Sequence, residues 1–369
     1  MKFKVEIYLV LLLLASVAPT VFAQTATEKD PRASQVASLP VAILGAPKTN
    51  STNAGGLVNP VANVNPSASE ERKPAAVESV QNSIRAGVAS LEAGRYKDAI
   101  ASFETAVQLD PNSSVVYTWL GYAYLGQNDY ENSIKAYERA VSLGATAFAT
   151  RRALAIAYLR LGKPEQAIPT LQEATRREPQ DAINHYLLAM AYADAGQLND
   201  AADNFLRSLA VDRNQYRSYF GLAAIYAEQS RTEDAIGLLK EAIRLKPDFG
   251  EAYLALANSL SSIGNYKDAI HSYDSAIKLD PQNPYARNNL GVAYLQIGKN
   301  KEGLAAFKCA ATLNPSIGEI RMNLARTYLL MRNKDAAVAE YTALNTIDSA
   351  QAKIIYDEIF EQRILKVRQ

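Results

Sequence analysis

The spacing of small and large apolar residues repeats at a constant interval from Val80 to Gln351, with no insertion or deletion. When each repeat is numbered 1 to 34, position 8 is always Gly or Ala, position 20 is Gly, Ala or Ser, and position 24 is always bulky. Positions 4, 7, 8 and 11 share one face of a helix, and positions 20, 24, 27 and 28 share one face of a second, because helical side chains meet every three or four residues. The pattern therefore predicts eight consecutive helical hairpins.

The sizes of these residues predict how the hairpins pack. Small residues at positions 8 and 20 let the two helices of a hairpin approach closely, and large residues at positions 7, 11 and 24 fill the space to the next hairpin. Proline at position 32 ends the second helix, because it lacks an amide donor and clashes with the preceding turn. After the last hairpin, apolar residues at helical spacing predict one more helix that caps the stack: Tyr356, Phe360, Ile364 and Val367.

This pattern resembles the tetratricopeptide repeat (TPR), whose 34-residue period and W-x-x-L-G-x-x-Y, A-x-x-x-F and Pro columns match it. The segment TWLGYAYLG, which begins at Thr118, carries Leu120, Gly121 and Tyr124 of that consensus. The resemblance implies an all-α fold: a right-handed α-solenoid of eight helix-turn-helix TPR units with a C-terminal capping helix. We expect the repeats and the residues before them to span 74–351 and the cap 352–369. The eight units are 80–113, 114–147, 148–181, 182–215, 216–249, 250–283, 284–317 and 318–351.

The segment before the repeats has a different character. Lys2 and Lys4 precede an apolar run, and Val21 and Ala23 supply the small residues that signal peptidase needs for a cut before Gln24. We therefore expect residues 1–23 to be a signal peptide, with the mature chain periplasmic or secreted. The run is too short for an ordinary membrane span, which needs about 20 residues. A leader retained as an anchor is the alternative. Residues 24–73, rich in Pro, Ala, Ser and Asn, predict a disordered linker.

Charge and candidate chemistry then narrow the function. The chain has 39 Lys and Arg against 38 Asp and Glu, which argues against nucleic acid as a partner. Of its two histidines, His185 falls at position 4 of one repeat and His271 at position 22 of another, so the stack should hold them apart. No zinc-spaced cluster, nucleophile elbow or phosphate-binding glycine loop occurs. We therefore expect no enzyme activity, no metal and no cofactor, and no integral membrane span in the mature chain.

The resemblance also implies where a partner would bind. In this family positions 2, 5, 9 and 12 of the first helices, with 6 and 13 nearby, line a concave groove in which an extended peptide lies. The predicted groove residues are apolar and aromatic in the first half and mostly amide in the second: Trp119, Tyr122, Ile156, Tyr186, Met190 and Phe220, then Asn258, Asn288, Asn289, Asn323 and Arg326. Asn289 and Asn323 share position 6, as two rungs of a possible asparagine ladder. Equally, an inner aromatic ring can simply pack on its neighbours along the helix.

Two classes of function remain open on the sequence. The first is a non-catalytic protein-protein interaction scaffold or adaptor in the extracytoplasmic space, which binds a partner peptide in the concave groove. The second is a structural subunit of a homo-oligomeric envelope or secretion assembly, because repeat arrays associate when their end faces are apolar.

Overall fold

The computed structural model describes residues 74–145 and 148–361, and within these ranges every regular element is a helix. They divide into two compact units at residue 212, and each unit is a helical-repeat solenoid. The first unit contains α4 (Pro74–Glu92), α5 (Tyr96–Leu109), α6 (Ser114–Gly126), α7 (Tyr130–Ser142), α8 (Phe148–Arg160), α9 (Pro164–Arg177), α10 (Ala182–Asp194) and α11 (Leu198–Val211). The expected signal peptide and linker lie outside the described residues.

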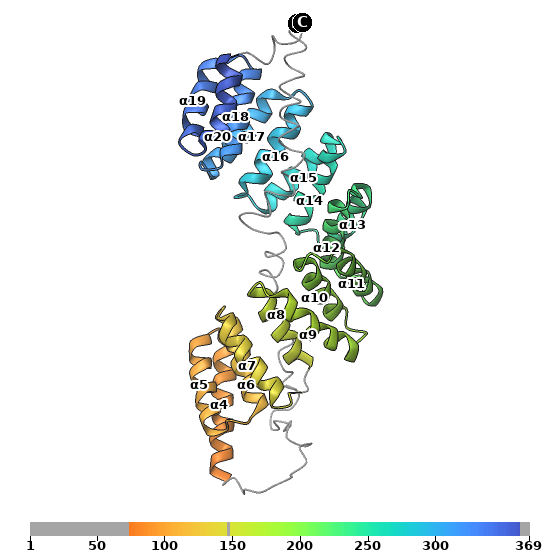
Figure 1. Ribbon diagram of the computed structural model, residues 1–369, viewed down its shortest axis with the longest axis vertical. Coiled ribbons are helices and arrows are strands. Elements are labelled where there is room, and N and C mark those ends of the chain that lie inside the picture. The colour runs from red at the N-terminus through yellow and green to blue at the C-terminus, as the bar shows by residue number, and fades with distance from the viewer. Residues whose placement is uncertain (1–73, 146–147, 362–369) are drawn as a thin grey trace. The chain divides into compact units, whose positions relative to one another are not determined.

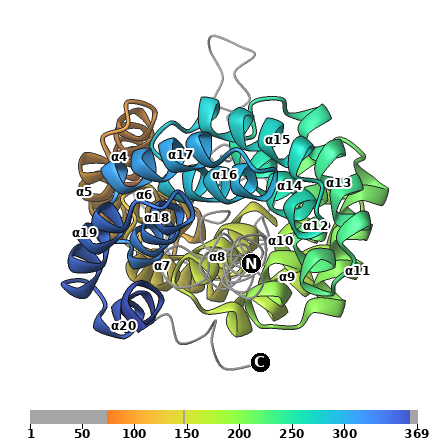
Figure 2. The same cartoon turned by 90° about the horizontal axis from the view of Figure 1, so that it is seen from above.

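The second unit continues the same arrangement. It contains α12 (Tyr216–Glu228), α13 (Thr232–Leu245), α14 (Gly250–Ser262), α15 (Tyr266–Leu279), α16 (Pro284–Gln296), α17 (Asn300–Leu313), α18 (Gly318–Leu330), α19 (Lys334–Asn345), α20 (Ser349–Tyr356) and the π-helix η2 (Asp357–Glu361). Within each unit, successive helices form hairpins that lie side by side (Figure 1, Figure 2). None of the described helices is long and apolar enough to cross a membrane.

The first helix of every hairpin ends in the same way. Position 15 adopts a left-handed backbone conformation throughout the array, which turns the chain into the second helix. Five of these residues are glycine and three carry a side chain: Gly94, Gly162, Gly196, Gly264 and Gly298, then Asn128, Ser230 and Arg332. Because a β-carbon disfavours this conformation, the turns at Ser230 and Arg332 are strained at φ values of 62 and 61°, whereas asparagine tolerates it at Asn128.

Close packing inside each hairpin depends on the small residue at position 8 facing the large residue at position 24. A β-carbon added to Gly121 would lie 2.8 Å from the ring of Tyr137, which is fully buried. One added to Gly291 would lie 2.7 Å from the ring of Phe307. The predicted close approach at positions 8 and 20 is seen in the bond from the Ser133 hydroxyl to the carbonyl oxygen of Gly121, at 2.8 Å. Position 24, which was expected to fill the space to the next hairpin, packs against position 8 of its own hairpin, because the missing side chain there leaves room for a ring.

Hydrogen bonds join neighbouring hairpins through the tyrosines at position 11. The Tyr124 hydroxyl donates to Glu104 Oε1 at 2.8 Å, from α6 to α5. Tyr158 makes the same bond to Glu138, and Tyr192 accepts one from Gln172. Burial, together with the neighbouring Glu104 carboxylate, raises the pKa of Tyr124 to about 12. Position 11 thus bonds to position 25 of the preceding repeat in these three hairpins.

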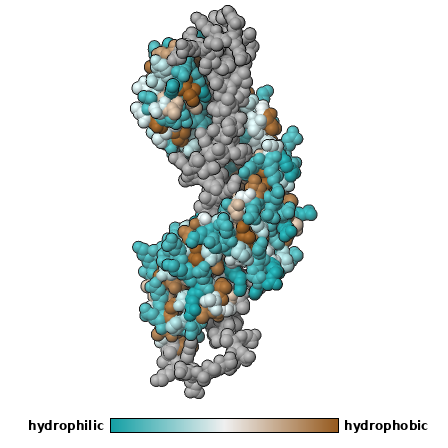
Figure 3. Space-filling model, viewed as in Figure 1, coloured by the Kyte–Doolittle hydropathy of each residue, from teal (hydrophilic) through white to brown (hydrophobic). Residues whose placement is uncertain are grey.

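The C-terminal end of the second unit is closed by α20 and η2. Ala352, Ile355 and Ile359 are buried against Met322 and Leu344. On another face of this segment, Tyr356 and Phe360 are 41% and 44% exposed. Elsewhere, the face of the protein drawn in Figure 3 is mostly hydrophilic, with apolar residues scattered among polar ones.

Candidate functional site

The predicted apolar groove residues of the first unit are contributed by α6, α8 and α10. Ile156, Tyr186 and Met190 are 3%, 2% and 2% exposed, and Trp119 is 8% exposed. Tyr122 is partly exposed, and burial of its ring raises its pKa. Position 2 on the same helix carries Val115, which is 45% exposed. Of the five predicted groove residues in this unit, only Tyr122 on α6 is therefore partly exposed.

Ring packing explains part of this burial. Trp119 stacks on Phe103 of α5 with ring centroids 6.2 Å apart, and the Tyr122 ring stands edge-on to Trp119 at 6.3 Å. Tyr186 packs on Phe205 of α11 at 6.0 Å. Trp119 and Tyr186 are therefore held by partners on second helices, as in an ordinary core.

Phe220 of the second unit has a similar place. Its ring lies 5.0 Å from that of Phe249, and both belong to a buried cluster that extends through α12 to α16. Phe249 also meets Tyr216 at 5.2 Å. Removing the Phe220 ring would open the core at this point, so a binding role for Phe220 stays a prediction that truncation alone does not test.

The four predicted asparagines bind one another in a chain that crosses α14, α16 and α18. Asn323 Nδ2 donates to Asn288 Oδ1 at 2.9 Å, and Asn288 Nδ2 donates to Asn289 Oδ1 at 3.3 Å. Asn289 Nδ2 donates to Asn258 Oδ1 at 3.0 Å, and this oxygen also accepts from the Tyr273 hydroxyl at 2.7 Å. Because the amides all donate in one direction, the bonds polarise and strengthen one another. The asparagines are thus engaged with one another across three hairpins.

Arg326 is bound by the C-terminal cap. Its Nη2 lies 2.9 Å from Glu358 Oε1, and its Nε lies 3.2 Å from both carboxylate oxygens. The two side chains are 4% and 7% exposed. Removing one partner of such a buried pair costs about 3–5 kcal/mol, because the other charge is left uncompensated. In this structure Arg326 therefore holds η2 against α18.

The position-4 side chains have a structural role. His185 Nε2 lies 3.0 Å from the carbonyl oxygen of Pro179, at position 32 of the preceding repeat. Arginines make the same contact elsewhere, from Arg151 to Ala145 and from Arg287 to Pro281. His271 lies exposed on α15. Among the residues that the structure describes, no three His, Cys, Asp or Glu side chains are grouped to hold a metal ion.

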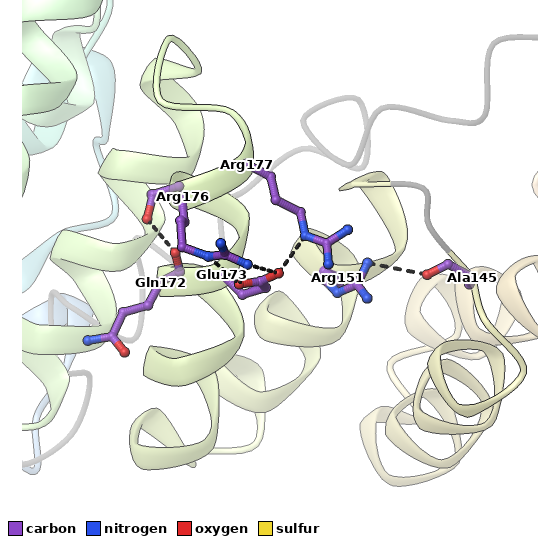
Figure 4. Close-up of polar contacts among 7 residues, drawn as sticks. Ala145, Arg151, Gln172, Glu173, Arg176 and Arg177 are labelled. Atoms are coloured by element: carbon purple, nitrogen blue, oxygen red, sulfur yellow. Dashed lines mark hydrogen bonds and ion pairs between the residues drawn. The ribbon is translucent and has the colours of Figure 1, made fainter.

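A set of arginines that the sequence interpretation did not single out lies at the end of α9 (Figure 4). Arg176 donates to Glu173 through Nε and Nη2, at 2.8 and 2.9 Å, and Arg177 donates to the same carboxylate through Nε. These bonds lower the pKa of Glu173. The same close-up shows Arg151 of α8, which donates to the carbonyl oxygen of Ala145. The signal in the sequence is position 30, which is Leu, Ile or Val in every other repeat and Arg177 here.

The family of this protein follows from comparison of its sequence with family models. A model described as "Tetratricopeptide repeat" matches residues 84–149, 152–210 and 186–248, and one described as "TPR repeat" matches residues 257–298. Together these ranges cover more than half of the chain, and the helical-repeat solenoid of both units agrees with them. The chain belongs to the tetratricopeptide repeat family. The family models do not test the number of repeats, so the count of eight stays a prediction from the sequence period.

Solved structures support the same fold. A tetratricopeptide repeat protein from Parabacteroides merdae ATCC 43184 is 17% identical with a TM-score of 0.54, over 68% of this chain and 99% of that one. The structure of pilF from Pseudomonas aeruginosa is 18% identical with a TM-score of 0.51, over 57% and 97%. A chain of the APC/C hetero-tetramer Cut9-Hcn1 is 16% identical with a TM-score of 0.52, over 72% and 52%. At these identities the likeness concerns the fold alone. No curated protein matches the sequence.

Proposed function

We propose that this protein is a non-catalytic scaffold that is exported and binds a partner peptide along the inner positions of its first helices. TPR proteins generally mediate protein-protein interactions, and family membership supports this class of function. Three properties are proposed beyond this class: the place where the peptide contacts the chain, the compartment in which the protein acts, and the association of copies of the chain.

The observation that carries the binding site is the surface of α6. Val115 is 45% exposed, and the partly exposed Tyr122 ring stands against Trp119, which rests in turn on Phe103. The packed rings of Trp119 and Tyr122, together with the exposed Val115 side chain, form an apolar surface that an apolar side chain of a peptide could contact. Aromatic side chains in such positions often dominate binding energy, and truncating one costs about 2 kcal/mol or more.

Tyr122→Ala tests this site, with Tyr117→Ala as the matched control. Both tyrosines are partly exposed on α6, but Tyr117 occupies position 4 and Tyr122 occupies inner position 9. Proteins cross-linked to the full chain in an envelope extract would be quantified for the wild type and both variants. We expect Tyr122→Ala to lose a partner that Tyr117→Ala retains. Unchanged capture by the Tyr122 variant, with its helix content intact, would contradict the proposed site.

Export is supported by the leader, in which Lys2 and Lys4 precede an apolar run and small residues precede Gln24. We expect fractionation to place the chain outside the cytoplasm and N-terminal sequencing to begin at Gln24. An intact Met1 terminus in a membrane fraction would show instead that the leader is retained. A cytoplasmic chain that starts at Met1 would refute export.

Self-association is the second candidate function, because aromatic rings are exposed on the last helices. Tyr356 and Phe360 lie 4.8 Å apart, and both pack on Tyr341 of α19. Light scattering over a concentration series would show a monomer-oligomer equilibrium that Phe360→Ser weakens. A mass that stays monomeric at all concentrations would rule out this function.

A further inference from the structure

The end of α9 carries more positive charge than its own carboxylates neutralise. Arg176 and Arg177 both pair with Glu173, so two positive groups meet one negative group. Arg151 occupies position 4 and Glu173 position 26 of the same repeat, and in the preceding repeat these positions are neighbours, with Arg139 5.9 Å from the centre of the Tyr117 ring. Arg151 donates to the carbonyl oxygen of Ala145 at 3.2 Å, which satisfies one N–H group and leaves its charge in place. The Arg176 and Arg177 side chains are 73% and 37% exposed, so both guanidinium groups are accessible to a second anion.

Another repeat of the same chain shows the equivalent ion pair without an excess of positive charge. In α13, Arg244 and Glu241 occupy the same positions 29 and 26 as Arg176 and Glu173, and they pair at 2.9 Å. There the next residue is Leu245, so one positive group meets one negative group. The repeat of α9 differs because it places Arg177 at the position that elsewhere carries an aliphatic residue. The salt bridge between positions 29 and 26 therefore forms in α13 without an equivalent of Arg177 or Arg151.

The preceding repeat carries an arginine at the position equivalent to Glu173. Arg139 of α7 occupies position 26, the position of Glu173, and its guanidinium lies 5.9 Å from the centre of the Tyr117 ring. Glu178, the residue after α9, is the next carboxylate along the chain. Counting Arg139, Arg151, Arg176 and Arg177 against the carboxylates next to them, Glu138, Glu173 and Glu178, four positive groups accompany three negative groups.

Helix stabilisation explains only part of this arrangement. Arg176 and Arg177 lie in the last turn of α9, where a cation interacts favourably with the helix dipole by about 0.3–1 kcal/mol. One cation is sufficient for that effect, as Arg244 shows in α13 and Lys278 in α15. Arg139 lies in the last turn of α7 and interacts with the dipole of that helix in the same way, whereas Arg151 lies near the start of α8, where the dipole does not favour a cation.

We propose that Arg139, Arg151, Arg176 and Arg177, here named the arginine edge, bind an acidic segment of the partner protein. The inference rests on the proposed scaffold function and adds a second point of contact with its own chemistry. Guanidinium groups bind carboxylates through two parallel N–H donors, a geometry that Arg176 already shows with Glu173. A peptide suits the edge better than a nucleic acid does, because the chain's formal net charge of only +1 gives little long-range attraction for a polyanion.

The test uses the full chain and a fluorescent hexaglutamate peptide as the probe, followed by anisotropy at low and physiological salt. We expect binding that weakens with salt, because the screening length of exposed charges falls from about 30 Å at 0.01 M salt to about 8 Å at physiological salt. The double variant Arg176→Glu, Arg177→Glu should bind the probe at least about tenfold more weakly, equivalent to 1.4 kcal/mol. The matched control Arg244→Glu reverses the same position of a balanced pair and should leave affinity unchanged.

Glu173→Gln provides a readout of opposite sign that loss of folding does not mimic. Removing the competing carboxylate frees Arg176 and Arg177, so the probe should bind several-fold more tightly. Equal weakening by Arg244→Glu and the double variant, or no binding at low salt, would overturn the proposal. Tighter binding of an oligothymidylate of equal charge would overturn it in favour of a nucleic acid. Partner capture that depends on Tyr122 is measured separately, so failure at the arginine edge leaves the scaffold function standing.

Discussion

Replacing Gly121 by alanine tests whether the close approach of the two helices depends on the missing side chain. The new β-carbon would lie 2.8 Å from Cδ1 and Cε1 of Tyr137, a ring that is fully buried and has no free space to move into. Overpacking of this kind costs about 1–3 kcal/mol. Alanine also favours a helix over glycine by about 1 kcal/mol, which offsets part of that cost. We therefore expect Gly121→Ala to change stability by about 0–2 kcal/mol in the destabilising direction.

Gly237→Ala is the matched control, because it changes helix propensity in the same way without crowding a neighbouring side chain. Gly237 lies inside α13, and a β-carbon there meets nothing within 4 Å, so the substitution should stabilise the chain by about 1 kcal/mol. The two variants should thus differ by about 1–3 kcal/mol. Urea unfolding followed by circular dichroism at constant m-value measures the difference, and hydrogen exchange in α6 and α7 localises it. If Gly121→Ala is as stable as Gly237→Ala, the reasoning from the repeat pattern is wrong.

Three further outcomes follow from the contacts described. Arg332→Gly removes a side chain from a left-handed turn at φ 61° and should raise the midpoint of urea unfolding by the equivalent of about 1 kcal/mol, whereas an unchanged midpoint would mean that the turn is not strained. Glu358→Gln leaves buried Arg326 without its counter-charge, so protection of α20 from hydrogen exchange should fall sharply, and unchanged protection would refute the role of the pair. Because the folded-state pKa of Tyr124 is raised from 10.0 to about 12, its contribution to stability is present below pH 10 and lost as pH rises toward about 12. Between pH 10 and about 12, the free energy of unfolding of Tyr124→Phe should therefore fall less than that of the wild type. An equal fall in both proteins would show that the Tyr124 hydroxyl does not contribute to this pH dependence.

The hairpins were predictable because their signal is local and periodic. Gly121 and Ser133 belong to the same repeat, and their small sizes already indicate that one helix must approach the other closely. The turns were harder to anticipate. Glycine at position 15 signals a left-handed residue, but Asn128, Ser230 and Arg332 adopt the same conformation because the hairpin on either side requires it. The surrounding structure thus overrides the preference of the single residue.

The contacts of the predicted groove residues could not be read from the sequence, and their role in binding stays a prediction. The inner positions did identify Asn258, Asn288, Asn289 and Asn323 together, and their bonding to one another depends on rotamers and on the offset between neighbouring hairpins. Likewise the sequence gives no sign that Glu358 of the cap reaches Arg326 in the preceding repeat. Such contacts arise between elements, and no local pattern encodes the distance between them.

The sequence alone determined the repeat, the helical hairpin as its unit and the family, because a strictly constant period demands the same packing each time. The tertiary structure decided which inner side chains are still available. It packs Trp119 on Phe103 and leaves Val115 exposed one turn earlier, although both lie on α6. It also joins Arg326 of α18 to Glu358 of η2, although the two lie 32 residues apart. The sequence period specifies the size of the side chain that each position requires within its own hairpin. The exposure and the charged partners of a side chain depend also on the neighbouring hairpins that pack against it.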